Sequence, residues 1–345
     1  MDYTIKQIQI KEIITETEDA KTFVLHPLNN WKPIYQAGQF LTLVFNTKFG
    51  EKRRSYSLSS SPEFNEPLSI TVKKVDNGEF SRSLLYDSKV GDVLHTSGIS
   101  GFFCLPENTE NIEQVFFLAA GSGITPCFSI IKTLLTTSDK EIVLIYSNKS
   151  EADIIFYRQL NSLLHQYPDR FHIRFLNSNS EGIFNKRLSK WLLSILLKEY
   201  LKAETSKVFF YLCGPFDYML MASITLLIEG IEAVNIRKEI FTPFPKINKP
   251  TPPDTDLHIV TIHINGNHYQ LPVQYPKTIL AVAKEKNIPL PYSCEVGSCG
   301  TCAATCSKGK IWMSYNEVLM DNEINKGRIL TCQGYPIEGD AEITF

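Results

Sequence analysis

The 345-residue chain has little net charge, no export signal and no internal repeat. A formal charge of −2 gives no electrostatic reason to expect a nucleic-acid partner. The opening residues, MDYTIKQIQIKEIITETEDAK, lack the apolar core and the small-residue cleavage site of a signal peptide. Five of the eight cysteines lie beyond residue 290, whereas disulfide frameworks are typical of short secreted domains. We therefore expect a cytoplasmic protein whose clustered cysteines serve a metal site.

An uninterrupted membrane-spanning run is also missing. Residues 116–135 carry a single charge, Lys132, and are about as long as a transmembrane helix. However, Gly121, Gly123 and Pro126 fall inside this stretch. A buried strand, a glycine turn and a helix explain the stretch better, so no membrane span is expected.

The pattern of apolar residues divides the chain into three folded segments. Residues 1–108 alternate apolar and polar residues between turn signals, which predicts an antiparallel β-barrel. Residues 109–241 alternate short apolar runs with helix-length stretches, which predicts an α/β domain with a parallel sheet. Residues 242–256 contain five prolines and indicate a stiff linker. Residues 257–345 begin with a hairpin around NGN and a helix, and they hold the cysteine cluster.

Unusual residues follow the strands of the predicted parallel sheet, where the ligands of such sheets bind. Gly121 and Gly123 would let backbone N–H groups approach a pyrophosphate, beside the positive end of the next helix dipole. Their segment lacks the third glycine of the usual dinucleotide fingerprint, so alone it also fits a plain strand-to-helix turn. Cys213 fits either a small buried side chain or one that faces a ligand. Together the strand ends predict a nucleotide site.

Two polar stretches in the first segment offer a second site. Arg54, Tyr56 and Ser57 are expected on one strand face, where arginine can fork onto phosphate and tyrosine can stack on a planar ring. Gly78 and Ser81 lie at the expected start of a helix, which is a further opportunity to bind phosphate. Each stretch alone is equally compatible with a solvated strand or turn.

The motifs RSYS, GEFS, GSGITP and CGP have the order and spacing of the ferredoxin–NADP reductase family, which residues 1–241 resemble. The resemblance implies a six-stranded barrel that binds a flavin, with FAD favoured over FMN, and an α/β domain that binds a nicotinamide nucleotide. It implies these positions: Arg54, Tyr56 and Ser57 at the flavin; Gly78 and Ser81 at its pyrophosphate; Gly121, Gly123, Thr125 and Pro126 in the nucleotide loop; Cys213, Gly214 and Pro215 beside the nicotinamide; Glu239 and Phe241 over the flavin. The candidate catalytic residues are Tyr56, Cys213, Glu239 and Phe241.

Four cysteines within thirteen residues have the spacing C-x4-C-x2-C-x3-C, and two kinds of site compete for them. A zinc ion would use Cys294, Cys299, Cys302 and Cys306, since Zn²⁺ accepts four thiolates. A plant-type [2Fe-2S] cluster would use the first three and the distant Cys332. Cys306 would lie about 13 Å beyond Cys302 along a strand, so we expect it in the core, before a turn at SKGK. The third segment resembles a plant-type ferredoxin domain of β-grasp fold, which favours the cluster.

The domain order resembles the reductase components of bacterial multicomponent oxygenases, among them that of phenylacetyl-CoA epoxidase. This implies that NAD(P)H gives a hydride to the flavin, which passes single electrons to the cluster and on to a protein acceptor. No acid–base triad is found in the sequence. An oxygenase component is the expected acceptor, with a hybrid-cluster protein or a non-catalytic redox sensor as alternatives. Residues 257–345 contain seven Lys or Arg and eight Asp or Glu, so charge steering does not name the partner.

The nucleotide preference is judged from the residues that follow the second strand of the parallel sheet. Ser147, Asn148 and Lys149 lie where a 2′-phosphate would sit, and Arg187 could also reach it. No acidic residue occupies the immediate strand end to bind a free ribose diol, although Glu151 is near. We therefore expect NADPH rather than NADH.

Overall fold

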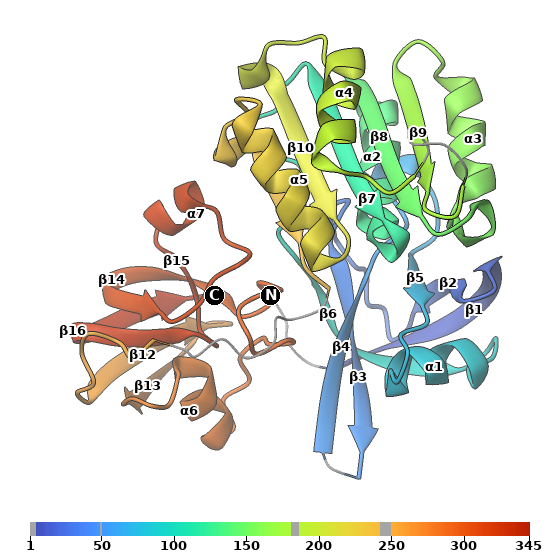
Figure 1. Cartoon of the computed structure of the whole chain (residues 1–345). Helices are drawn as coiled ribbons and strands as arrows, with labels where there is room; N and C mark the ends of the chain where they lie inside the picture. The colour runs from blue at the N-terminus through green and yellow to red at the C-terminus, as the bar shows by residue number, and fades with distance from the viewer. Residues whose placement is uncertain (1–4, 49, 181–185, 242–249) are drawn as a thin grey trace.

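The computed structural model describes residues 5–48, 50–180, 186–241 and 250–345, and it folds them into three sheets (Figure 1). We call the part that contains the first sheet the barrel domain, the second the parallel-sheet domain and the third the C-terminal domain. Within the described ranges, no helix is both long and apolar enough to cross a lipid bilayer. Residues 116–135, which are about as long as a transmembrane helix, form a strand, a glycine turn and a helix, as predicted.

The barrel domain is a six-stranded antiparallel sheet in the order β4-β3-β6-β1-β2-β5. Its elements are β1 (Lys6–Thr17), β2 (Ala20–Pro27), β3 (Phe40–Thr47), β4 (Gly50–Ser57), β5 (Ser69–Lys73), α1 (Glu79–Tyr86) and β6 (Val93–Ser100). The two edges meet just beyond β4, where Leu58 bridges to Ile70 and the Ser59 amide donates to the Ser69 carbonyl at 2.9 Å. Because the edge strands meet in this way, the sheet closes around one apolar core, and the predicted barrel is confirmed.

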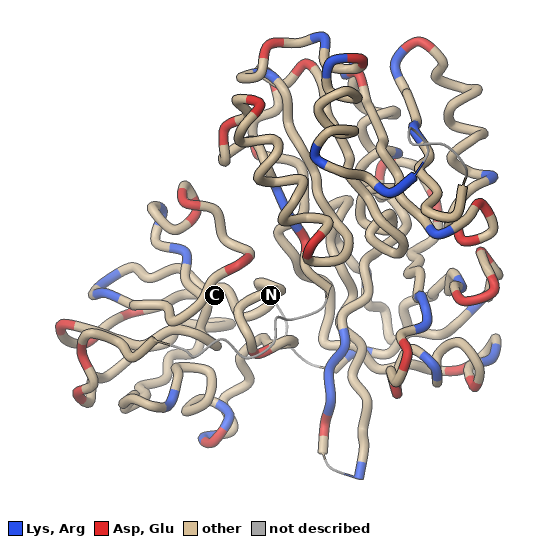
Figure 2. The backbone as a smooth tube through the Cα atoms, viewed as in Figure 1, with Lys and Arg blue, Asp and Glu red and all other residues tan. Residues whose placement is uncertain are grey.

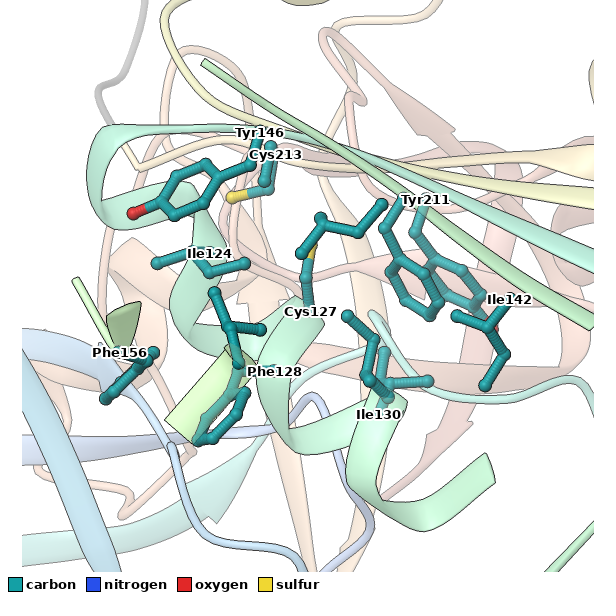
Figure 3. Packing of buried hydrophobic residues seen from close by; sticks show 14 of the residues in the cluster. Ile124, Cys127, Phe128, Ile130, Ile142, Tyr146, Phe156, Tyr211 and Cys213 are labelled. Carbon is teal, nitrogen blue, oxygen red and sulfur yellow. The ribbon is translucent and has the colours of Figure 1, made fainter. Parts of the chain in front are cut away.

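The parallel-sheet domain has five parallel strands in the order β11-β10-β7-β8-β9. Its elements are β7 (Gln114–Ala120), α2 (Ile124–Thr137), β8 (Glu141–Asn148), α3 (Tyr157–Gln166), β9 (Phe171–Asn177), α4 (Lys190–Tyr200), β10 (Val208–Cys213), α5 (Phe216–Ile228) and β11 (Ile236–Glu239). Alternate residues of β7 pack on opposite faces: Phe117 joins the cluster under α2 and α3 (Figure 3), and Phe116 joins the cluster under α4 and α5. Both faces are covered, which explains the nearly continuous apolar run of β7.

The C-terminal domain is a five-stranded sheet in the order β13-β12-β16-β14-β15, with the short helices α6 and α7. Its elements are β12 (His258–Ile264), β13 (Asn267–Val273), α6 (Ile279–Glu285), β14 (Ala303–Met313), α7 (Asp321–Asn325), β15 (Arg328–Leu330) and β16 (Gly334–Thr344). Asn265 and Gly266 both have positive φ, as a two-residue hairpin between β12 and β13 requires.

One sequence expectation in this domain is wrong. The segment around SKGK was expected to turn the chain back, but β14 continues through it to Met313. The strand stays paired with β16 before and after this segment. The register of the pairing shifts between Cys306 and Lys308 and again between Lys308 and Lys310. Gly309 supplies the positive φ, so the glycine that suggested a turn serves a β-bulge.

The proline-rich linker lies mostly outside the described residues. Its described part, 250–256, contains no helix or strand. Asp254 accepts a hydrogen bond from the Glu338 amide at 2.8 Å and contacts His258 at the same distance. The end of the linker is therefore attached to the C-terminal domain.

Candidate functional site

A cavity of about 1240 Å³ is lined by β3, β4, α1 and β6 of the barrel domain. Figure 2 shows basic residues in a run along β4, and Lys52 and Arg54 of this run line the cavity. The wall combines basic and aromatic side chains: Lys48, Lys52, Arg54, Arg82 and His95 with Phe45, Phe80 and Tyr86. Basic groups suit phosphate and aromatic rings suit a planar base, so the wall fits a nucleotide-like anion.

Arg54 and the start of α1 form the part of this wall that the sequence predicted. The Arg54 guanidinium lies 4.8 Å from the centre of the Phe80 ring, which packs on Phe45 at 4.5 Å. Gly78 caps α1, and the Ser81 hydroxyl accepts a hydrogen bond from the Val75 amide at 3.1 Å. Ser81 therefore fixes the turn that precedes the helix.

Strand β4 presents two different faces, because successive side chains of a strand point in opposite directions. Lys52 and Arg54 line the cavity, and Tyr56 lies on the same strand face. Ser57 lies on the opposite face with Ser55 and donates a hydrogen bond to the carboxylate of Glu239 at 3.0 Å. This corrects the expectation that Arg54, Tyr56 and Ser57 share one strand face.

Glu239 ends β11 and is therefore a residue of the parallel-sheet domain bonded to the barrel domain. Surrounding groups desolvate its carboxylate and raise the pKa of Glu239 to about 8, although the Ser57 hydroxyl opposes this shift. Burial also raises the pKa of Tyr56 above its ordinary value. Phe241, two residues beyond Glu239, is 45% exposed. The carboxyl edge of the parallel sheet thus meets the barrel strand that lines the cavity.

The glycine turn after β7 packs directly on the end of β10. A Cβ atom on Gly123 would collide with the carbonyl oxygen of Cys213, so only glycine lets α2 begin this close to the sheet. Cys213 is fully buried and lies near Tyr146 and Ile124 in the apolar cluster (Figure 3). Of its two possible roles, this burial supports the small core residue. Gly214 and Pro215 follow directly and lead into α5.

Polar side chains gather at the carboxyl ends of β7, β8 and β9. Among the described residues, the hydroxyl of Thr125 and the amide oxygen of Asn177 are buried without a hydrogen-bond partner. Ser147 and Asn148 end β8, and Lys149 follows as an exposed residue. Unpaired buried polar atoms are costly, so their concentration at this edge fits a polar ligand. Pro126 is buried in the first turn of α2.

The four predicted iron ligands form two pairs. Cys294 contacts Cys299, and Cys302 contacts Cys332, although Cys332 comes from a distant part of the chain. The contact with Cys299 and nearby backbone N–H groups lowers the pKa of Cys294 to about 5. The Val296 amide points at the sulfur of Cys294 at 3.5 Å. Two cysteine pairs suit two iron atoms, and the N–H groups aimed at the Cys294 sulfur favour its thiolate state.

Cys306 lies apart from these pairs. Its thiol is partly buried against the core of the C-terminal domain and bonds to the Lys308 carbonyl at 3.4 Å. In the described part of the chain, no three His, Cys, Asp or Glu side chains gather as ligands of a metal ion. The arrangement thus favours the two-pair interpretation with Cys332 over a zinc site that includes Cys306.

Three family models match successive parts of the chain. They are the oxidoreductase FAD-binding domain at residues 7–104, the oxidoreductase NAD-binding domain at 117–223 and the 2Fe-2S iron–sulfur cluster binding domain at 262–336. The ferredoxin reductase component of 3-ketosteroid-9-alpha-monooxygenase from Mycolicibacterium smegmatis is 31% identical, over 99% of this chain and 97% of that protein. The chain belongs to this family of iron–sulfur flavoprotein reductases.

Other relatives of the reductase extend the comparison. One component of the 1,2-phenylacetyl-CoA epoxidase from Escherichia coli is 28% identical, over 99% of this chain and 98% of that protein. A glycine betaine monooxygenase reductase from Pseudomonas aeruginosa is also 28% identical, over 98% and 94%. Phthalate dioxygenase reductase shares the fold, with a TM-score of 0.61, 22% identity and coverage of 99% and 98%. The three matched family models identify FAD, a nicotinamide nucleotide and a [2Fe-2S] cluster as the cofactors that this chain's domains bind.

The sequence pattern did not predict several residues that line the cavity. Phe45, Phe80, Arg82 and His95 line the cavity, but they lie on three separate elements. Phe80 had a signal, because it stands between Gly78 and Ser81 at the start of a predicted helix. The others carry no local pattern that distinguishes them from ordinary surface residues.

Proposed function

We propose that the reductase takes electrons from NADPH and delivers them singly to an oxygenase component. When bound, FAD accepts a hydride and supplies single electrons to the cluster. The observation that carries the proposal is the position of β4 among the three sites. Ser57 bonds to Glu239 at the nucleotide edge, and Ser55 lies 2.8 Å from Ser293, the residue before the first cluster cysteine.

The barrel cavity supports the roles proposed for the flavin site. Arg54, with Lys52 and Arg82, would neutralise the pyrophosphate of FAD, and Gly78 would leave the start of α1 open to it. Tyr56 would pack against the flavin ring. A cavity of about 1240 Å³ with aromatic walls also offers room for the adenosine that distinguishes FAD from FMN.

Glu239 and its neighbours would orient the reacting rings rather than form a covalent intermediate. At neutral pH a carboxyl with a pKa of about 8 is mostly protonated, so the Glu239 region presents little negative charge to an approaching hydride donor. Ser57 holds the carboxyl in place. Cys213 would hold the end of β10 against the glycine turn at Gly123, where the nicotinamide would bind. The exposed Phe241 would cover the flavin.

For the nucleotide, we propose a site formed by Gly121, Gly123, Thr125 and Pro126, together with Ser147, Asn148, Lys149, Cys213, Gly214 and Pro215. Lys149 is exposed directly after β8, and Arg187 is exposed shortly before α4. Both would be available to a 2′-phosphate, which favours NADPH. Measuring kcat/KM with both nucleotides tests this preference. An equal or higher value with NADH would contradict it.

The partner proposal rests on the relatives. Their names assign them to a ketosteroid monooxygenase, a glycine betaine monooxygenase and a phenylacetyl-CoA epoxidase, at similar identities of 28–31%. An oxygenase component is therefore the proposed acceptor, with that of a phenylacetyl-CoA epoxidase as one candidate. We also propose a cytoplasmic location, which fits the finding that none of the eight cysteines, all within the described residues, forms a disulfide. The proposed domain limits are 1–108, 109–241 and 257–345, joined by the linker 242–256.

Anaerobic titration with NADPH tests the electron path directly. We expect the absorbance of both flavin and cluster to bleach, and bleaching of neither would refute the proposal. A colourless purified protein would instead indicate zinc at the cysteines. Bleaching with negligible turnover of cytochrome c would favour the redox sensor. NADPH-dependent turnover of a purified oxygenase component would identify the partner.

A further inference from the structure

Strand β4 contacts the C-terminal domain with the face that does not line the cavity. Arg53 and Ser55 alternate with Lys52, Arg54 and Tyr56, so they point away from the proposed flavin site. The side-chain contacts of both residues reach chain segments more than 230 positions away. This strand is therefore shared by two sites.

The contacts of this second face converge on the segment that leads into the cluster cysteines. Ser55 Oγ lies 2.8 Å from Ser293 Oγ, next to Cys294. The Arg53 guanidinium stacks over the Tyr292 ring at 3.8 Å and donates to the Tyr292 carbonyl at 3.2 Å. Only 12% of the Arg53 side chain is exposed, which strengthens the cation–π contact.

A separate group of contacts supports the other end of the cysteine loop. Ser100, at the end of β6, pairs with Thr301 at 3.2 Å, and the Thr301 hydroxyl lies 3.4 Å from the Cys299 sulfur. Gly300 packs so closely on Phe102 that a Cβ there would come within 2.6 Å of the ring. Both ends of the loop thus lie against the barrel domain.

We propose that β4 supports both redox sites, with Arg53 and Ser55 as positioning residues for electron transfer from flavin to cluster. The inference rests on the proposed function, because it concerns the step between its two redox groups. The short path from Tyr56 through Ser55 to Ser293 and Cys294 crosses one hydrogen bond. Loss of this bond would let the cluster loop move away from the strand without disturbing the opposite face.

The experiment uses the full-length protein loaded with flavin and cluster. Ser55→Ala, Ser293→Ala and the double variant are mixed anaerobically with NADPH, and flavin and cluster reduction are followed separately. We expect cluster reduction to slow by about three- to tenfold, the range for one hydrogen bond, with the flavin rate within twofold of wild type. The double variant should be no slower than either single variant, because both remove the same contact.

Hydrogen exchange provides a readout that needs no turnover. Amides in residues 292–301 should exchange faster in Ser55→Ala and in Arg53→Gln, with Arg53→Lys intermediate because it retains the charge over Tyr292. Ser59→Ala is the matched control, since Ser59 pairs with Ser69 at 2.9 Å inside the barrel domain. The control should change neither exchange in 292–301 nor cluster reduction.

The outcomes separate this inference from the proposed function. Unchanged exchange and unchanged cluster reduction in Ser55→Ala and Arg53→Gln would overturn the inference while leaving the electron path intact. Failure of NADPH to reduce the flavin of the wild-type protein would refute the proposed function instead. The exchange data would still show whether β4 holds the loop.

Discussion

The barrel domain meets its two neighbours through contacts of very different kinds. Against the parallel-sheet domain, the buried Lys132 of α2 pairs with Glu66, and Ser61 Oγ lies 2.7 Å from Thr133 Oγ1. Against the C-terminal domain it uses the hydroxyl pairs and the Arg53 stack described above. The charged group of the first interface, Lys132, has 4% of its side chain exposed, whereas Arg53 in the second has 12% exposed and its neighbours are neutral hydroxyl pairs.

This difference indicates which domains can separate. Opening the first interface would expose Ala37 and Phe64 of the barrel domain, which pack in the apolar cluster under α2. Losing Glu66 while the interface stays closed would leave the Lys132 ammonium without the partner that offsets its desolvation. The contacts of the second interface can be replaced by water at smaller cost. We infer that the barrel and parallel-sheet domains form a fixed pair, whereas the C-terminal domain is held more weakly.

The largest expected effect comes from removing the cluster, whose cysteine loop lies at the second interface. Cys332→Ser should lose the cluster absorbance, because one of the two thiolate pairs is broken. The loop around Cys294 should then lose hydrogen-exchange protection, while α2 and its contacts with the barrel domain keep theirs. Cys306→Ser is the control and should retain the cluster. A Cys332→Ser protein with a normal cluster spectrum would show that the ligand assignment is wrong.

The next effect tests the first interface. Glu66→Gln leaves Lys132 buried without its charged partner and should lower the free energy of unfolding by about 3 kcal/mol. Denaturant unfolding of the full-length protein, compared with the wild type, measures this loss. Glu63→Gln is the control from the same segment. Glu63 accepts a hydrogen bond from Thr133 at 3.0 Å and, among the described residues, pairs with no buried cation, so its loss should cost about 1 kcal/mol. Equal losses in the two variants would contradict the comparison.

Local patterns predicted the elements better than the interfaces between them. The apolar run of β7 indicated a strand covered on both faces, and the apolar clusters on the two faces confirm it. In the sequence, Lys132 is distinguished only as the single charge in an apolar stretch. Its partner Glu66 is 66 positions away, and no pattern in the sequence links the two.

The candidate site shows the same limit. The spacing of Cys294, Cys299 and Cys302 predicted the loop, and the structure brings the distant Cys332 to it. The RSYS motif pointed to β4, but alternation along the strand separates Ser57 from Arg54, which the motif alone did not reveal. Contacts such as Ser55 with Ser293 join weakly patterned residues across 238 positions, so only the fold identifies them.

A smaller effect concerns pH and the carboxyl that joins β11 to the barrel. An unfolded glutamate ionises near its ordinary pKa of 4.5, whereas Glu239 holds its proton up to about pH 8. Between these values the folded state binds more protons, so the free energy of unfolding should fall as pH rises. The slope from this group is at most about 1.4 kcal/mol per pH unit. Glu239→Gln should remove this pH dependence, so the free energy of unfolding of the variant, relative to the wild type, should increase from pH 5 to pH 8. A difference between the two proteins that is constant with pH would contradict this assignment.

The smallest effect should come from the ion pair that links the parallel-sheet domain to the C-terminal domain. Arg237 of β11 donates to the Phe102 carbonyl and lies 3.4 Å from Glu323 of α7, with 14% and 19% of the two side chains exposed. Glu323→Gln should raise amide exchange in α7 and Phe102 by a few-fold, since a partly exposed pair contributes about 1 kcal/mol.

A matched exposed pair sharpens this last test. Lys326 and Glu107 lie 3.9 Å apart with 72% and 95% of their side chains exposed, so Lys326→Gln should change nothing measurable. Raising the salt concentration should reproduce part of the Glu323→Gln effect, because screening weakens partly exposed pairs. The same salt should leave exchange around the buried Lys132 unchanged. If salt released both interfaces equally, the C-terminal domain would be held as firmly as the parallel-sheet domain, and the distinction between a fixed pair and a weakly held third domain would fail.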